Sequence, residues 1–244
     1  MASKQVTDRD RSSSQVTTAA EVNATEIAQK LEALLTPRMQ VGEVAPDFAF
    51  MVRLIGRHLA HHASALNAAD LAHEAELGDD VQPRVERDDA EVDLRETTVS
   101  YRNALGAGYG DAALRTHGVA VAAPPDTRGL VRYAKDFRSG LRDAARTPSA
   151  PARNGLVVDR AALAAELTPR IERLEAALEA VTREAEELKL TQTAKDNAMD
   201  ANDTAFSGVA NALEGLLILA GRKDLAARIR PSTRKPGVVD QAGS

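Results

Sequence analysis

Four of the chain's five histidines lie close together in the sequence, at His58, His61, His62 and His73. Imidazole binds metal ions and exchanges protons near neutral pH, so this cluster raises the question of a metal or proton-transfer site. His62 and His73 are separated by roughly 16 Å along a helix, and one ion cannot bind both. The histidines therefore form two separate groups.

His58, His61 and His62 form the first group, at the edge of the expected helix. His58 and His62 are one helical turn apart, a spacing that allows two imidazoles to bind one ion. Two ligands fill only half of a tetrahedral shell, and the sequence does not identify the others. We therefore expect these histidines to be partly solvated side chains on a helix flank.

Asp70 and His73 form the second group, at positions where a helix presents its apolar side. A turn near residue 80 would place them opposite Asp88 and Glu91. These four residues are the candidate metal ligands, and Asp-x-x-His opposite Asp-x-x-Glu is similar to the ligand sets of di-iron helical bundles. Those bundles carry two Glu-x-x-His motifs on different helices, and this chain has none. A mutually paired polar network is the alternative that we favour.

Other catalytic chemistry finds no support in the sequence. The chain has no cysteine, which excludes disulfides, thiolate nucleophiles and cysteine-ligated metals. Nucleophile-elbow, Walker, dinucleotide-binding and zinc-protease motifs are also missing. The glycine-rich segment Gly106–Gly110 follows a helix and is typical of a helix end. We expect no catalytic residues and no organic cofactor, and a metal ion is the one cofactor left open.

Composition favours an all-α protein. Hydrophobic residues make up 43% of the chain but aromatic residues only 3%, so the core must consist of Ala, Leu and Val, which suits closely packed helices. The net charge of −5 gives no strong indication of nucleic-acid binding. The sequence shows no apolar segment long enough to cross a membrane and no apolar leader. We expect a cytoplasmic protein, and the excess of Arg over Lys suggests a GC-rich bacterial genome.

A repeat with an offset of about 108 residues suggests two helical hairpins. Apolar residues follow a heptad pattern from Leu167 to Leu188, a polar stretch follows, and apolar residues resume at Phe206. The same order begins at Leu59, with Asp70 and His73 in place of apolar residues. The predicted fold is an antiparallel four-helix bundle made of two hairpins, with helices over residues 46–77, 84–106, 159–190 and 197–220. One helix of about 50 residues over 167–220 is the alternative, because no Gly or Pro marks the second turn.

These patterns divide the chain into five segments. A Ser/Thr-rich arm at 1–23 and a tail at 231–244 are predicted to be disordered. The first hairpin, with a short leading helix, occupies 24–107, a connection 108–157, and the second hairpin 158–230.

The connection contains an amphipathic helix over 126–146. Its polar side is strongly basic, which suggests an acidic partner, a membrane surface or nucleic acid. A solvated basic face that covers acidic helices explains it equally well. The candidate interaction residues are Arg128, Arg132, Lys135, Arg138 and Arg142.

The sequence therefore favours a non-enzymatic scaffold, adaptor or self-assembling subunit, which binds a protein partner or other copies of itself through helices. A ferritin-like or redox metal-binding bundle is a second hypothesis. A membrane-active helical protein is a third, although the chain lacks an aromatic belt.

Overall fold

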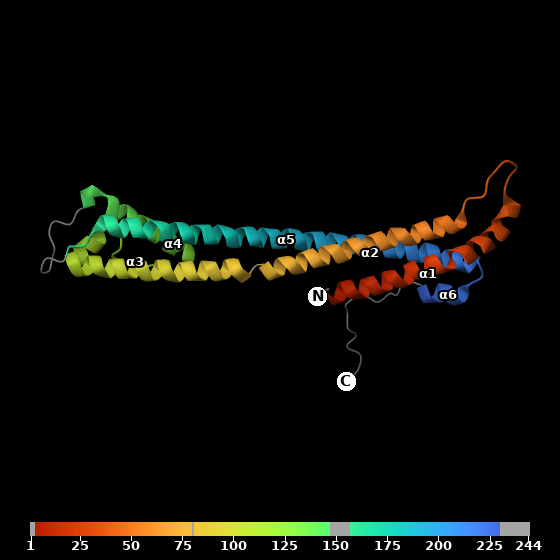
Figure 1. Ribbon diagram of the computed structural model, residues 1–244, viewed down its shortest axis with the longest axis horizontal. Helices are drawn as coiled ribbons and strands as arrows, with labels where there is room; N and C mark the ends of the chain where they lie inside the picture. The colour runs from red at the N-terminus through yellow and green to blue at the C-terminus, as the bar shows by residue number, and fades with distance from the viewer. Residues whose placement is uncertain (1–2, 80, 147–156, 230–244) are drawn as a thin grey trace, which may run out of the picture. The chain divides into compact units, whose positions relative to one another are not determined.

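The computed structural model describes residues 3–79, 81–146 and 157–229, and this part of the chain is all-α, without strands. The helices separate into two compact units, Met1–Leu77 with Leu188–Ser244, and Gly78–Glu187. Figure 1 labels the helices. Their bounds are α1 Lys4–Leu35, α2 Phe48–Asp79, α3 Val81–Thr116, α4 Thr127–Arg142, α5 Arg160–Leu219 and α6 Lys223–Ile229, with short 3-10 turns at Thr36–Arg38 and Ala144–Arg146.

The first unit packs α1, α2, the C-terminal half of α5 and α6 around one core. Ile27 and Leu31 of α1 meet Leu59 of α2 and Leu213 of α5, and each of these side chains is buried. Gly56 lets α1 and α2 approach closely, because a Cβ atom there would lie 2.8 Å from the Cβ of Ala20. Small residues therefore form much of this interface.

The predicted disordered arm at 1–23 is wrong for residues 4–23, which are the first part of α1. Ser3 caps the helix by accepting a hydrogen bond from the Val6 amide, and Val6, Val16 and Ala20 are buried. The buried side chains of this segment are small and widely spaced, so its composition resembles that of a disordered segment. The prediction for 231–244 lies outside the described residues.

The second unit packs α3, α4 and the N-terminal half of α5 around Phe137, which is fully buried. The basic amphipathic helix predicted in the connection is confirmed as α4, and Asp126 caps it by accepting a hydrogen bond from the Gly129 amide. Gly110 interrupts α3 with a φ of 78°, a conformation that favours glycine. This break occurs at the end of the glycine-rich segment noted in the sequence.

The second predicted hairpin is wrong, because residues 160–219 form the single helix α5. The polar stretch at 191–203 continues the helix because its inward-facing side chains, Lys195 and Asn202, are buried against polar partners. The two helices of the first predicted hairpin contribute to separate cores. The core residues of α2 pack with α1 and α5, whereas those of α3 pack with α4 and α5.

Candidate functional site

A buried ion pair joins α2 and α5 within the first unit. The carboxylate of Asp70 on α2 is fully buried, and Nζ of Lys195 on α5 lies 2.6 Å from its Oδ1. The backbone amide of Ser3, next to α1, donates a hydrogen bond of 2.9 Å to Oδ2. One side chain of α2 therefore holds both α5 and the start of α1.

Burial alone would raise the pKa of Asp70, but its partners outweigh burial. The Lys195 ammonium and the Ser3 amide stabilise the carboxylate, and the pKa of Asp70 is lowered from its ordinary value of 3.8. Asp70 is therefore ionised at neutral pH, and the pair is a buried charged pair between α2 and α5.

Further polar pairs extend from this ion pair along α5. Nδ1 of His73 lies 3.1 Å from the hydroxyl of Thr191, so the two form a hydrogen bond. Ser13 of α1 donates to Asn202 over 3.3 Å, and Arg9 binds the carboxylate of Asp203 with two bonds of 2.8 Å. We call these residues together with Asp70, Lys195 and Ser3 the polar layer. It joins α1, α2 and α5 through paired groups.

The four residues predicted to bind a metal have separate partners. Asp70 and His73 belong to the first unit, and Asp88 and Glu91 to the second. Asp88 pairs with Arg87, while Glu91 accepts hydrogen bonds from Arg95 and Thr127. The expectation that Asp70 and His73 face Asp88 and Glu91 depended on a hairpin of α2 and α3, and these two helices contribute to separate cores. A metal site at these residues stays a prediction, and the contacts favour structural roles for them.

Lys195 is the partner of Asp70 that the sequence analysis did not identify. It lies in a stretch of alternating polar and charged residues that was interpreted as a turn. Its heptad position, in phase with the apolar residues on either side, is the one signal that could have identified it as buried.

The basic side of α4 is partly occupied by α5. Nζ of Lys135 lies 2.5 Å from the carboxylate of Glu175, and Arg142 donates to the hydroxyl of Thr168. Arg128 and Arg132 are exposed, and Arg138 is half-buried. These contacts support the interpretation of α4 as a basic helix that covers an acidic one, and its role in binding a partner stays a prediction.

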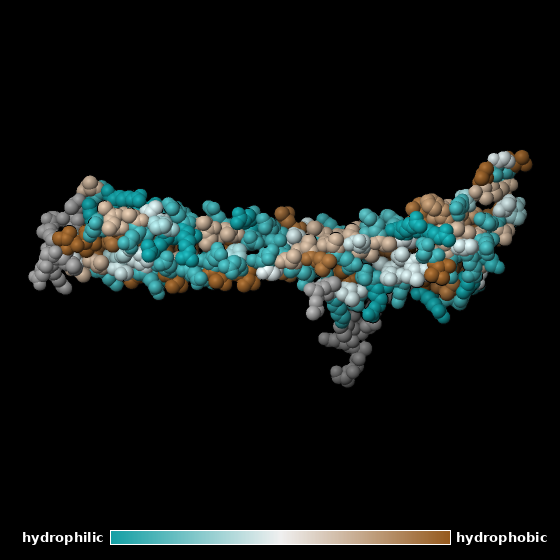
Figure 2. Space-filling model, in the orientation of Figure 1, coloured by the Kyte–Doolittle hydropathy of each residue, from teal (hydrophilic) through white to brown (hydrophobic). Residues whose placement is uncertain are grey.

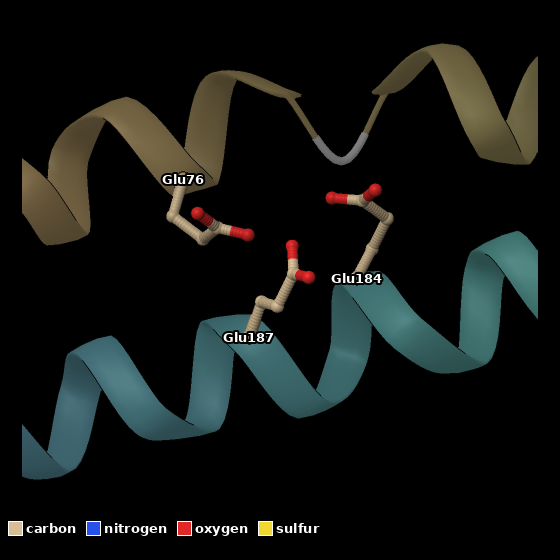
Figure 3. A group of neighbouring side chains, drawn as sticks. All are labelled: Glu76, Glu184 and Glu187. Carbon is tan, nitrogen blue, oxygen red and sulfur yellow. The ribbon is translucent and has the colours of Figure 1, made fainter.

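Two glutamates of α5 place neighbouring carboxylates on the surface of the helix. Glu184 and Glu187 lie about one turn apart, and Figure 3 shows both leaving the same side of the helix. Glu76, labelled in the same figure, belongs to the first unit. Carboxylates on a helix surface are common without a bound ion, so Glu184 and Glu187 by themselves do not define a site.

Four exposed valines form a straight row on α3. Val81, Val85, Val92 and Val99 are between 41% and 64% exposed, and they lie within about 40° of one another around the helix axis. Figure 2 shows hydrophobic residues along the outer edge of α3. The buried residues Ala90 and Leu94 lie on the opposite side of the helix. This valine row is a mainly apolar helix face, interrupted by Asp88, that the second unit itself does not cover.

His117 is a buried titratable group of the second unit. Its Nδ1 donates to the carbonyl oxygen of Gly140 over 3.0 Å, and its Nε2 meets no hydrogen-bond partner among the described residues. Burial lowers the pKa of His117 from 6.5, and the cations Arg160 and Arg146 lower it further, against the effect of the Gly140 bond and Asp143. His117 is therefore neutral in the folded chain at neutral pH.

This histidine predicts an acid-sensitive second unit. Below pH 6.5 the unfolded chain binds a proton at His117, whereas the folded chain binds it only at a lower pH, because the pKa of His117 is lowered by folding. The free energy of unfolding therefore decreases as the pH falls below 6.5. His117→Gln keeps the donor to Gly140 without titrating, and we expect it to flatten this dependence between about pH 7.5 and pH 5. Urea unfolding followed by tyrosine fluorescence measures it. His61→Gln, at an exposed site, should keep the wild-type slope, and an unchanged slope in His117→Gln would contradict the assignment.

None of the helices in the described part of the chain is long and apolar enough to cross a membrane. Comparison with protein-family models, with curated proteins and with solved structures finds no match to this chain.

Proposed function

We propose that this chain is a non-enzymatic, self-assembling helical protein, and that copies associate through the valine row of α3. The observation that carries the proposal is the row itself: four valines on one line of a helix, on the side opposite the core of their own unit. Fully burying one such side chain stabilises an interface by roughly 1.5 kcal/mol or more. A second helix along the row would supply that burial.

The spacing of the row fits a helix as the covering element. Val85, Val92 and Val99 are seven residues apart, which is the repeat by which two helices pack along a shared seam. Asp88 lies in the same row between two of the valines. A polar residue within such a seam selects one register over others at some cost in stability.

The charges beside the row support a second copy as the partner. Arg84 lies on one flank, and Asp89 and Glu96 lie on the other, and all three are exposed. In a parallel pair of helices each flank meets the opposite flank of the partner, so Arg84 of one copy would face Asp89 of the other. A row with flanks of opposite charge is therefore compatible with itself.

Light scattering across a range of protein concentrations tests this proposal. We expect the average mass of the wild-type chain to rise above that of a monomer as the concentration increases. Val92→Glu places a charge in the middle of the row and is expected to weaken association by about tenfold or more, since a buried unpaired charge costs several kcal/mol.

Val22→Glu is the matched control, because Val22 is also exposed but lies on α1 of the first unit. It should associate like the wild type. A wild-type chain that stays monomeric at every concentration, or a Val22→Glu variant that loses association as Val92→Glu does, would contradict the proposal.

A further inference from the structure

The histidine edge group, His58, His61 and His62, lies on α2 with the rings in contact. The ring centroids of His58 and His62 are 4.7 Å apart, and the rings meet edge to face at 81°. Those of His61 and His62 are 5.6 Å apart, at 75°. The described residues give none of the three imidazoles a hydrogen bond or an ion pair. These ring nitrogens therefore make no hydrogen bond or ion pair that would stabilise the described part of the unit.

Two of the three histidines border a hollow between α2 and α5. This hollow has a volume of about 1060 Å³ and lies entirely within the first unit. His58 and His62 line it from α2, and Asp200 and Thr204 line it from α5. Arg57 also lines it. His61 does not border the hollow, which distinguishes it from its two neighbours.

The imidazole of His62 is kept neutral at neutral pH. Burial lowers the pKa of His62 from its ordinary value of 6.5, and the neighbouring His58 and His61 lower it further. A neutral imidazole has a lone pair that can bind a metal ion, whereas a protonated one has none. The His62 imidazole therefore has a lone pair available to a metal ion.

We propose that His58 and His62 form a bidentate site for a divalent first-row transition metal such as zinc, nickel or copper. Their spacing of one turn places both rings on the same side of α2, and imidazole side-chain torsions can turn one nitrogen of each ring toward a common ion without moving the backbone. Imidazole nitrogen prefers these ions to magnesium or calcium, which bind oxygen. Water completes the coordination shell from the hollow.

Isothermal titration of the full-length chain, made without a histidine tag, tests this site with zinc and with nickel. We expect one equivalent of either ion to bind. His58→Ala and His62→Ala should each weaken binding by about tenfold or more, because each removes half of the protein's ligands. His61→Ala is the matched control, since it removes a neighbouring histidine that does not border the hollow, and it should bind as the wild type does.

A second measurement identifies the atoms that bind the metal. Copper(II) bound to the wild-type chain should show an electron paramagnetic resonance spectrum with two nitrogen ligands, and the His58→Ala complex should not. Failure of zinc and nickel to bind the wild-type chain would contradict the proposed metal site. Equal losses in His61→Ala and His58→Ala, or magnesium binding as tightly as zinc, would contradict it as well.

Discussion

Lys195→Met is expected to lower the free energy of unfolding of the first unit by about 3–5 kcal/mol, because it leaves a buried carboxylate without its cation. Asp70 is fully buried, and Nζ of Lys195 is 2.6 Å from its Oδ1. Methionine nearly matches the length of lysine, so the loss reflects charge rather than a cavity. Urea unfolding followed by far-ultraviolet circular dichroism measures this change.

Two further variants separate the ion pair from general effects on α5. Lys189→Met removes an exposed lysine of the same helix, and we expect a change within about 0.5 kcal/mol. The double variant Asp70→Leu with Lys195→Met replaces both charges and should recover most of the lost stability, since apolar replacements of a buried pair are often neutral. A Lys195→Met chain within about 1 kcal/mol of the wild type would contradict the account of the polar layer.

Phe137→Ala is expected to destabilise the second unit by about 3–5 kcal/mol, through the loss of buried apolar surface and the cavity that remains. Phe137 is fully buried and belongs to the same hydrophobic core as Leu94 and Leu167. All three tyrosines of the chain, Tyr101, Tyr109 and Tyr133, lie in the same unit. Tyrosine fluorescence therefore follows its unfolding separately.

Arg132→Ala is the control for this prediction. Arg132 lies on the exposed side of α4, and its replacement should change the free energy of unfolding by no more than about 0.5 kcal/mol. If Phe137→Ala unfolds at the same urea concentration as the wild type, the core described for the second unit is wrong.

The helices that the sequence predicted well are those whose apolar side chains are large and regularly spaced. In α4 the residues Leu130, Phe137 and Leu141 face the core, and Asp126 provides a recognisable cap. In α1 the inward residues include Ser13, Ala20 and Ala24, which are small enough to pack closely against α2 but give no clear apolar period. Their burial depends on Gly56 across the interface, which the local sequence cannot show.

The sequence identifies Asp70 and His73 of the candidate site but not Lys195. Asp70 and His73 stand out because they occupy apolar positions of a helix, and the structure places both in a polar network. Asp88 and Glu91 were included because a turn expected near residue 80 would place them opposite Asp70 and His73. The true partner, Lys195, lies more than a hundred residues away in a stretch that resembles a turn. Its pairing with Asp70 depends on the register of α5 against α2, and no local pattern specifies that register.

Cysteine cross-linking at the valine row tests self-assembly through α3 most directly. The chain has no cysteine, so Val92→Cys introduces a single thiol. With a short bismaleimide, the purified Val92→Cys chain should form covalent dimers in high yield, whereas Val22→Cys, exposed on α1, should remain mainly monomeric. A Val92→Cys chain that stays monomeric, or that cross-links no more than Val22→Cys, would contradict assembly through the valine row.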